Sequence, residues 1–262
     1  MNPRNTTIVK LGGSLLENAA LRAEALKAIT AAWRAGESIV LVHGGGKRID
    51  ASLEKLGIPK KTQGGLRITD AATLDVVVSV LAGVVNKSLV AELQSYGGAA
   101  AGLSGVDGET LKAELHPPID GVDLGFVGKI VDANPRLIVS VMSRGFLPVV
   151  SSVASGPNGT LLNVNADSAA SALASALRAK KLIFLTDVEG LLNADQRLVK
   201  FLTVRQARDV LGSDLVTGGM RPKLQASVDA IAYGVYEVVI AGPNFHATAL
   251  LEGTGGTHLV AA

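Results

Sequence analysis

Short apolar runs alternate with longer segments of helical periodicity along most of this chain. Most of these runs are rich in Val, Ile and Leu and end at Gly or polar residues, which is typical of buried strands. We predict strands over residues 7–11, 38–42, 99–103, 147–151, 181–186 and 237–241.

The segments between the runs repeat apolar residues at every third or fourth position. In the segment 19–35, for example, Leu21, Ala25 and Ile29 fall on one face, which predicts an amphipathic helix. The same spacing predicts helices over residues 19–35, 47–56, 71–96, 135–144, 167–178 and 220–233.

Strands that alternate with helices predict a mainly parallel sheet covered on both faces. Residues 112–131 break this rhythm, because Pro and Gly punctuate short alternating segments there, and this predicts β-hairpins. Asn158-Gly159 predicts a further hairpin turn. For a chain of 262 residues we predict a single domain with two lobes that meet near residues 170–180.

The composition argues against several classes of function. The chain has no Cys, which excludes disulfides, thiolate metal sites and a Cys nucleophile. Its net charge of +2 is too small to argue for a nucleic-acid or membrane surface. The most apolar stretch, Val76–Val85, is too short to span a membrane, and no signal-peptide core precedes the first strand. We therefore predict a cytoplasmic protein whose core is aliphatic, since only 3% of its residues are aromatic.

Lys10 stands inside the first predicted strand, between Val9 and Leu11. A Lys in such an apolar run is costly to bury unless an anion meets it. Gly12 and Gly13 follow, and because they lack Cβ atoms their backbone N–H groups can approach a ligand closely. This combination predicts one side of a phosphate site.

A second glycine turn, Gly44–Gly46, follows the second predicted strand. Ligands in open α/β sheets bind at the carboxyl ends of strands, so both glycine turns are expected at one edge of the sheet. Each turn precedes a helix, whose free N–H groups and positive dipole end favour an anion. Either turn alone would be an ordinary turn, whereas two turns with a strand Lys favour a phosphate site.

The established phosphate and hydrolase motifs do not fit the chain. Gly46-Lys47 is followed by Arg48 where a P-loop needs Ser or Thr, and no Gly-x-Gly-x-x-Gly opens a helix. Ser104 lacks the final glycine of a nucleophile elbow. The four His residues have no metal-ligand spacing, so no metal site is predicted, and His43 is expected to pack at the end of its strand.

Two later segments carry more polar groups than helix capping requires. Residues 163–167 open an Ala-rich helix with three short polar side chains, and a cap would explain only Asn165 or Asp167. Lys223 lies at the N-terminus of a predicted helix, where the helix dipole disfavours a cation, so a shared anion is predicted. Taken alone, Lys223 would equally fit a solvated position.

Arg67 follows two glycines and offers a bidentate guanidinium for a carboxylate.

Six segments, in register along the chain, resemble the amino acid kinase family, and within it the members that phosphorylate N-acetyl-L-glutamate in arginine biosynthesis. The likeness extends from about residue 7 to residue 259 and is therefore far more specific than any single motif. The segments are Lys10-Leu-Gly-Gly, Val42-His-Gly-Gly-Gly46, Gly65-Leu-Arg67-Ile-Thr-Asp70, Asn163-Val-Asn-Ala-Asp167, Thr186-Asp-Val-Glu-Gly190-Leu-Leu and Gly218-Gly-Met-Arg-Pro-Lys223.

The resemblance implies a fold and a function for each lobe. The fold is of the α/β class, a three-layer αβα sandwich around a mainly parallel central sheet, with β-hairpins forming a lid over the substrate. The lobe of residues 1–175 would bind the acylated amino acid, and the lobe of residues 176–262 would bind the nucleotide. ATP would be the co-substrate and would carry Mg²⁺ on its phosphates.

The resemblance also assigns roles to single residues. Lys10 and Lys223 would stabilise the transferring phosphoryl group, and Asp167 would hold the two lysines. The other assignments are Gly12, Gly13 and Gly45 for the phosphate; Gly45, Gly46, Arg67 and Asn163 for N-acetylglutamate; and Thr186, Asp187, Gly190, Leu191, Leu192, Thr217, Gly219, Met220 and Lys223 for the nucleotide.

The expected assembly follows from two departures from the hexameric, arginine-inhibited relatives. Only nine residues precede Lys10, and the segment 251–258 looks shorter than the C-terminal segment of those relatives. We therefore expect a homodimer that is insensitive to arginine, with small molecules as its partners and neither nucleic acid nor membrane.

Two other functions remain open at this point. A sibling kinase that acts on an acylated aminoadipate would differ by one methylene in its substrate, which a pocket discriminates by only ~1–3 kcal/mol. A non-catalytic amino acid sensor on the same fold is the second alternative. It is disfavoured because such a sensor has no need for Lys10, Asp167 and Lys223 together.

Overall fold

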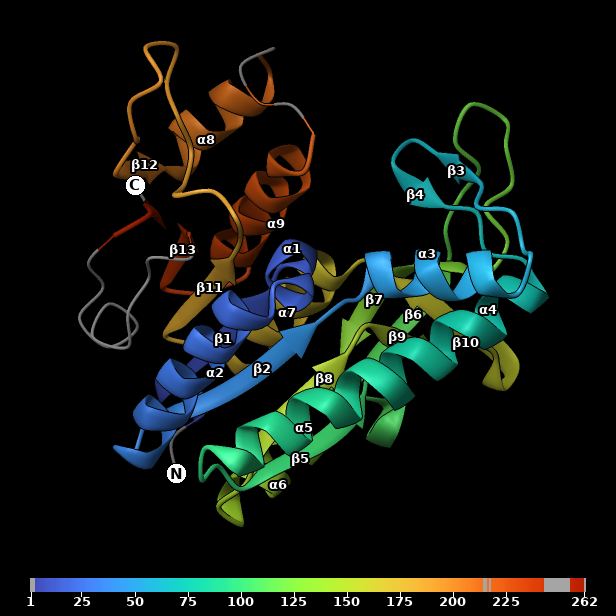
Figure 1. The fold of residues 1–262 in the computed structure, drawn as a ribbon. Helices are drawn as coiled ribbons and strands as arrows, with labels where there is room; N and C mark the ends of the chain where they lie inside the picture. The colour runs from blue at the N-terminus through green and yellow to red at the C-terminus, as the bar shows by residue number, and fades with distance from the viewer. Residues whose placement is uncertain (1–2, 214–215, 217, 243–254, 262) are drawn as a thin grey trace.

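An eight-stranded sheet forms the centre of the molecule (Figure 1). The computed structural model describes residues 3–213, 216, 218–242 and 255–261. Across the sheet the strands are β12 (Phe201–Thr203), β14 (Thr257–Val260), β13 (Glu237–Ala241), β11 (Lys181–Leu185), β1 (Thr6–Leu11), β2 (Ser38–His43), β8 (Leu147–Ser151) and β5 (Ala100–Ser104). All neighbouring strands are parallel except β13 and β14, which confirms the predicted mainly parallel sheet.

Helices cover both faces of this sheet. Because successive strand residues point to opposite faces, each face has its own hydrophobic core. Ile8 belongs to one hydrophobic core and its neighbour Val9 to the other. The Ile8 core includes α6 (Arg136–Ser143), α7 (Ala166–Leu177), α8 (Val204–Leu211) and α9 (Met220–Ala232). The Val9 core includes α1 (Gly13–Glu17), α2 (Ala19–Arg34), α3 (Gly46–Lys55), α4 (Ala71–Val78) and α5 (Asn86–Ser95). The three-layer αβα sandwich is therefore confirmed.

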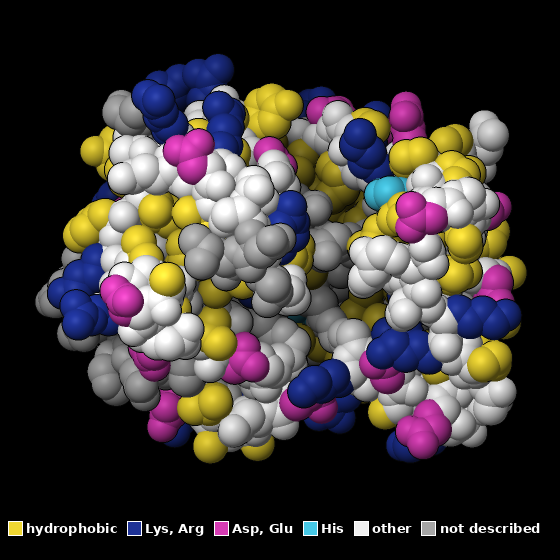
Figure 2. Space-filling view, turned by 90° about the horizontal axis from the view of Figure 1, so that it is seen from above, with side chains coloured by type: hydrophobic (Ala, Val, Ile, Leu, Met, Phe, Trp, Pro, Cys, Tyr) yellow, Lys and Arg dark blue, Asp and Glu magenta, His cyan; other side chains and the backbone are white. Residues whose placement is uncertain are grey.

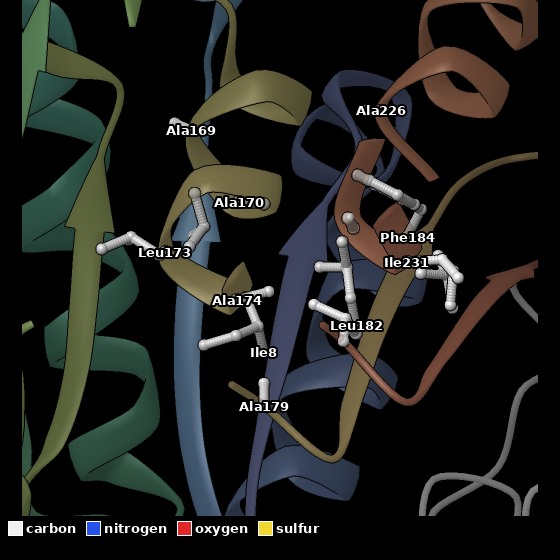
Figure 3. Close-up of a cluster of buried hydrophobic side chains, with 14 of the residues drawn as sticks. Ile8, Ala169, Ala170, Leu173, Ala174, Ala179, Leu182, Phe184, Ala226 and Ile231 are labelled. Carbon is white, nitrogen blue, oxygen red and sulfur yellow. The ribbon is translucent and has the colours of Figure 1, made fainter. Parts of the chain in front are cut away.

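Small side chains bring α7 close to the middle of the sheet. Figure 3 shows Ala170 and Ala174 of α7 in the same cluster as Ile8 of β1. All three residues are fully buried, and so is Phe184 of β11, one of the few aromatic residues in the chain. Because Ala adds little bulk, α7 packs directly against β1 and β2.

A small closed barrel stands beside the sheet and accounts for the predicted hairpins. It consists of β6 (Leu111–Leu115), β7 (Val127–Ala133), β9 (Val153–Ser155) and β10 (Leu161–Val164). β6 pairs with β7 and β9 pairs with β10 in antiparallel fashion, so both predicted hairpins are confirmed. Asn158 and Gly159 form the turn between β9 and β10 with φ of 54° and 76°.

A further hairpin was not among the predicted elements. β3 (Thr62–Gln63) and β4 (Leu66–Arg67) pair across Gly64 and Gly65, whose φ values of 55° and 79° suit a tight primed turn. The hairpin lies beside the segment 116–125 (Figure 1). Nε2 of Gln63 donates a hydrogen bond of 2.9 Å to Asp120.

The long helix predicted over residues 71–96 is present but not uniform. Its middle, Ser79–Val85, is a π-helical segment between α4 and α5. The combined helix Ala71–Ser95 is long and apolar enough to cross a membrane by length and composition alone. Val77, Leu81, Leu89 and Leu93 are buried in the Val9 core, and the core helix of a soluble protein passes the same test.

Short elements of the C-terminal half were not predicted. They are β12, α8 and β14, and the 3₁₀ turns Pro3–Asn5, Asp107–Glu109 and Pro157–Gly159 were missed as well. The predicted boundary between the lobes, at residues 175 and 176, falls inside α7. The division into two lobes stays a prediction.

Candidate active site

Lys10, Asp167 and Lys223 come together at one edge of the sheet. Lys10 is near the carboxyl end of β1, while Asp167 and Lys223 lie in the first turns of α7 and α9. Nζ of Lys10 lies 2.6 Å from Oδ1 of Asp167, and Nζ of Lys223 lies 3.5 Å from Oδ2. One carboxylate therefore stands between two ammonium groups, and we call these residues the Asp167 cluster.

The Asp167 cluster is buried and carries excess positive charge. The side chains of Lys10, Asp167 and Lys223 are 8%, 7% and 13% exposed. Burial opposes ionisation of Asp167, but the ammonium groups of Lys10 and Lys223 outweigh it and lower the pKa of the carboxyl. Burial also lowers the pKa of Lys10 against the opposing charge of Asp167. Two cations for one carboxylate leave a positive potential that favours an anion.

The turn after β1 places one of its two glycines against β11. The N–H of Gly12 donates to the carbonyl of Leu185 at 2.7 Å, and a Cβ on Gly12 would lie 2.7 Å from the same oxygen. Gly13 begins α1, and a Cβ there would meet nothing within 4 Å. The N–H of Gly12 is therefore already hydrogen-bonded. Gly12 could serve the predicted phosphate only by letting the backbone approach it closely. Gly13 keeps the free helix-terminal N–H that an anion needs.

The Gly44–Gly46 turn joins β2 to α3, and there is little room for a side chain at Gly44 and Gly45. A Cβ on Gly44 would lie 3.2 Å from Cβ of Ala166, at the start of α7. A Cβ on Gly45 would lie 2.9 Å from Cδ2 of Leu81. The first N–H groups of α3 have no partner within the helix, so this turn also offers donors to an anion.

Arg67 reaches from the β3–β4 hairpin toward the same turn. Its Nη2 donates to the carboxylate of Asp50 on α3 and, at 3.2 Å, to the carbonyl of Gly46. Asp50 also accepts a hydrogen bond of 2.9 Å from Lys60. Nη1 of Arg67 is buried and finds no partner among the described residues. A buried, unpaired guanidinium nitrogen is costly, which favours an anionic ligand at this atom.

Asn163 and Asn165 have different positions around the start of α7. Oδ1 of Asn165 caps the helix, since it accepts from the N–H groups of Asp167 and Ser168. Asn163, on β10, donates from Nδ2 to Oγ1 of Thr69 at 3.2 Å. Capping therefore explains Asn165, whereas Asn163 and Asp167 remain available for other roles.

The predicted nucleotide residues begin directly after β11. Thr186 donates to Asp187 at 3.0 Å. Burial opposes ionisation of Asp187, but hydrogen bonds from its own backbone, Thr186 and Ser14 lower the pKa of its carboxyl. The side chain of Leu191 is buried in the Ile8 core, whereas Leu192 is 42% exposed.

The remaining nucleotide residues lie at a glycine contact and at the start of α9. A Cβ on Gly190 would lie 2.5 Å from Oγ1 of Thr257, so the chain approaches β14 closely there. Gly219 and Met220 begin α9, one turn before Lys223. Thr217 lies outside the described residues.

A hollow separates two halves of the molecule above this edge of the sheet. The view from above shows it between the half with the β3–β4 hairpin and the half with α8 and α9 (Figures 1 and 2). Within the described part of the chain, no group of three or more His, Asp or Glu side chains is placed to hold a metal ion.

Sequence reasoning missed one member of this site. Asp50, on α3, anchors both Arg67 and Lys60. It follows the basic pair Lys47-Arg48 on an ordinary polar helix face. Nothing in that pattern separates a carboxylate that orients an Arg from a solvated one.

Comparisons with known proteins agree on one family. The model of the amino acid kinase family matches residues 5–242. The acetylglutamate kinase of Gloeobacter violaceus is 44% identical over 250 residues, which cover 94% of this chain and 82% of that relative. The acetylglutamate kinase of Solibacter usitatus is 44% identical over 234 residues, which cover 89% of this chain and 90% of that relative.

A solved structure shares the whole architecture. The smu.665 protein of Streptococcus mutans UA159 superimposes with a TM-score of 0.84 at 28% identity, and the match covers 99% of this chain and 100% of that one. The sheet and its helical layers described above are therefore shared with that structure over nearly the whole chain.

Proposed function

Because this chain belongs to the amino acid kinase family, we propose that it transfers the γ-phosphoryl group of ATP to the side-chain carboxylate of N-acetyl-L-glutamate. The product is N-acetyl-L-glutamyl 5-phosphate, an intermediate of arginine biosynthesis. The acetylglutamate kinases that match the chain over most of their length support this substrate. The observation that carries the chemistry is the single buried carboxylate between Lys10 and Lys223.

The acceptor chemistry requires positive charge rather than a base. A side-chain carboxylate is already ionised near neutral pH and can attack without losing a proton. The obstacle is to bring this anion against a polyphosphate. Catalysis therefore depends on cations and N–H groups directed at the oxygens of the transferring group.

Lys10 and Lys223 supply these cations from two sides. In the proposed mechanism Lys10 contacts the transferring phosphoryl group from β1, and Lys223 contacts it from α9. Asp167 holds both ammonium groups and prevents them from moving apart. The N–H groups of Gly13 and Gly45 bind the oxygens of the γ-phosphate, with Gly12 giving the close approach.

The acylated amino acid binds on the side of the β3–β4 hairpin. The free Nη1 of Arg67 takes the α-carboxylate of the substrate, and Nδ2 of Asn163 hydrogen-bonds its polar groups. Gly45 and Gly46 form the floor of the pocket with their backbone. The hairpin acts as the lid over this pocket.

The nucleotide binds on the other side of the cleft. Residues 1–175 form the acyl amino acid lobe in this proposal, and residues 176–262 form the nucleotide lobe. ATP brings Mg²⁺ on its phosphates, in keeping with a cation that retains several waters and substrate phosphate ligands. The residues proposed to line the nucleotide site are Thr186, Asp187, Gly190, Leu191, Leu192, Thr217, Gly219, Met220 and Lys223.

Turnover with a set of acceptors tests the proposal. ATP consumption is measured with N-acetylglutamate, glutamate and N-acetylaminoadipate in parallel, and hydroxylamine traps the acyl phosphate as a hydroxamate. We expect hydroxamate with N-acetylglutamate at the highest kcat/KM. A higher value with N-acetylaminoadipate would favour the sibling kinase, and no hydroxamate with any acceptor would favour the sensor.

The assembly, arginine response and location stay predictions. Light scattering in solution would test the homodimer, and hexamers would contradict it. An arginine titration of the kinase activity would test insensitivity, and inhibition at sub-millimolar arginine would contradict it. Fractionation of cells that express the chain would test the cytoplasmic location.

A further inference from the structure

Two polar side chains with no exposed surface, His43 and Asn86, lie behind the Gly44–Gly46 turn. His43 is the last residue of β2, and Asn86 is the first residue of α5, directly after the π-helical segment Ser79–Val85. Nδ2 of Asn86 lies 3.1 Å from Nε2 of His43. Burial of such groups is unfavourable unless their hydrogen bonds are made inside the protein.

Asn86 contacts three neighbouring strands of the sheet. Besides His43, its Nδ2 lies 2.9 Å from the carbonyl oxygen of Val149 on β8 and 3.1 Å from that of Leu103 on β5. Its Oδ1 accepts a hydrogen bond of 3.1 Å from Lys87. Because every polar atom of the amide is engaged, Asn86 is fixed relative to the carboxyl edge of the sheet.

The hydrogen bonds of His43 define its protonation. Nδ1 lies 2.9 Å from the carbonyl oxygen of Gly44, which only accepts, so the ring proton is on Nδ1. Nε2 is then free to accept from Asn86. Burial lowers the pKa of His43 to about 4, so the ring is neutral near neutral pH. The imidazole is a rigid spacer between Asn86 and the first peptide group of the turn.

The π-helical segment contacts the turn from its other side. A Cβ on Gly45 would lie 2.9 Å from Cδ2 of Leu81 and 3.3 Å from Cγ2 of Val85. Both side chains belong to the π-helical segment. π-helical turns are rare and recur at functional sites. Here the segment places two apolar side chains against Gly45 and directs Asn86 toward His43.

We propose that Asn86 and His43 are positioning residues for phosphoryl transfer. Together with the π-helical segment, they fix the peptide groups of Gly44 and Gly45 where the γ-phosphate binds. This inference rests on the proposed function, since it names what holds one phosphate-binding turn of that site. Neither side chain touches substrate; both act through the backbone of the turn.

Two variants disturb Asn86 in different ways. Asn86→Ala removes the amide. Gly102→Ala keeps it but displaces it, because the new Cβ would lie 2.1 Å from Oδ1 of Asn86. In both we expect kcat to fall about 10-fold or more, since a shift of about 1 Å in a positioning group costs up to 10²-fold. The KM for N-acetylglutamate should change little.

Nucleotide binding separates positioning from a general structural role. The non-hydrolysable ATP analogue AMP-PNP carries a γ-phosphate and ADP does not. We expect both variants to bind AMP-PNP more weakly, about 10-fold, and ADP as the unmodified chain does. Equal affinities of the variants and the unmodified chain for both nucleotides would overturn the proposal.

Leu93→Ala is the matched control. Leu93 is fully buried on the same helix, two turns beyond Asn86, and its loss destabilises the fold without reaching the turn. We expect its kcat and its ratio of AMP-PNP to ADP affinity to be unchanged. The same loss of kcat in Leu93→Ala as in Asn86→Ala would overturn the proposal.

The tautomer of His43 gives a test that needs no turnover. The ¹⁵N chemical shifts of the imidazole should show the proton on Nδ1 in the unmodified chain; in Asn86→Ala the proton should stay on Nδ1, while the shift of Nε2 moves because it loses its hydrogen-bond donor. A proton on Nε2 in the unmodified chain would overturn the proposal. If N-acetylglutamate were not phosphorylated, the proposed function would fail, while the nucleotide and tautomer measurements would still decide the positioning role.

Discussion

Two buried ion clusters stand at opposite ends of the central sheet, and each joins one carboxylate to two basic side chains. The Asp167 cluster lies at the carboxyl end of β1. At the amino ends of β11 and β13, Glu237 lies 3.1 Å from Nζ of Lys181 and 2.6 Å from Nδ1 of His258. We call the second group the Glu237 cluster.

In the Glu237 cluster, both ring nitrogens of His258 have partners within the protein. Nε2 of His258 lies 2.9 Å from the carbonyl oxygen of Gly255, and Nδ1 faces Glu237. In the Asp167 cluster, by contrast, both basic side chains are lysines, and among the described residues a single carboxylate serves the two ammonium groups.

This difference supports our assignment of the proposed reaction to the Asp167 cluster. Each cluster joins one carboxylate, which is mostly buried, to two basic side chains, so this combination alone does not identify the reaction site. What distinguishes the Asp167 cluster is its position at the carboxyl ends of parallel strands, beside two glycine turns, and its unshared positive charge. Variants of the two clusters should accordingly affect different properties, and their effects follow from the largest to the smallest.

The largest effect is expected on turnover from the lysines of the Asp167 cluster. Lys10→Ala or Lys223→Ala should lower kcat by roughly 10²-fold or more, because each removes a cation that stabilises the transferring phosphoryl group. Steady-state kinetics of the purified variants measures the effect. Lys181→Ala, from the Glu237 cluster, is the matched control and should keep its kcat. Near-wild-type turnover in either active-site variant would contradict the assignment.

A second effect concerns stability in mild acid and involves His43. Burial lowers the pKa of His43 to about 4 in the folded chain, whereas the unfolded chain has the ordinary value of 6.5. At pH values below 6.5 the unfolded chain therefore binds the proton more readily than the folded chain does. Stability present above pH 6.5 is therefore lost as the pH falls toward about 4, by about 3 kcal/mol for this group. Urea unfolding across this range measures it.

His43→Gln has no imidazole to titrate, so the remaining loss of its stability in acid comes from the carboxylates. Its stability should be flatter between pH 6.5 and about 4 than that of the unmodified chain. The pKa values of Asp167 and Glu237 are also lowered, the first by its two lysines against burial and the second chiefly by His258. Stability from both clusters should then be lost only below about pH 4. An unchanged slope in His43→Gln would contradict the buried neutral ring.

A smaller effect is expected on substrate affinity from Asp50. This carboxylate orients Arg67 and also contacts Lys60. It is therefore a third carboxylate that joins two basic side chains. Asp50→Ala should raise the KM for N-acetylglutamate about 10-fold, the cost of losing one hydrogen bond to a charged group, with a smaller change in kcat. Lys60→Ala is the control and should leave KM close to its original value. A rise in KM for ATP alone would contradict the role of Arg67.

The smallest effect is expected from the Glu237 cluster itself. Glu237→Gln should lower the free energy of unfolding by about 1 kcal/mol, because it weakens two charge-assisted hydrogen bonds at a partly exposed side chain. Chemical denaturation measures this loss, and kcat should not change. A loss of turnover comparable with that of Lys10→Ala would erase the distinction between the two ends of the sheet.

Most of the regular elements could be predicted because their periodicity is local. The π-helical segment could not be predicted. Its apolar residues, such as Leu81 and Val85, fit the pattern of an ordinary α-helix equally well. The closed barrel also escaped prediction, because the parallel pairing of β7 with β10 depends on tertiary contacts. The start of α8 was missed although Thr203 and Gln206 form a capping box that the sequence displays.

The site was predictable where residue type and backbone position coincide. Lys10 in an apolar strand and two glycine turns indicated an anion before any family was considered. Asp50 and Asn86 could not be found in this way, because their importance comes from partners on other elements. The engaged N–H of Gly12 likewise depends on the carbonyl of Leu185, far along the chain.

The order of the strands has a consequence for synthesis of the protein. β1 leaves the ribosome well before β11, yet it lies in the middle of the sheet with β11 as one neighbour. At typical rates of translation, β11 follows only about 10–30 s later. Until then one edge of β1 carries unpaired backbone groups in an apolar strand, which is a hazard for aggregation. The nascent chain must therefore be shielded during this interval, and Lys10 can join Lys223 in the Asp167 cluster only after α9 has been translated.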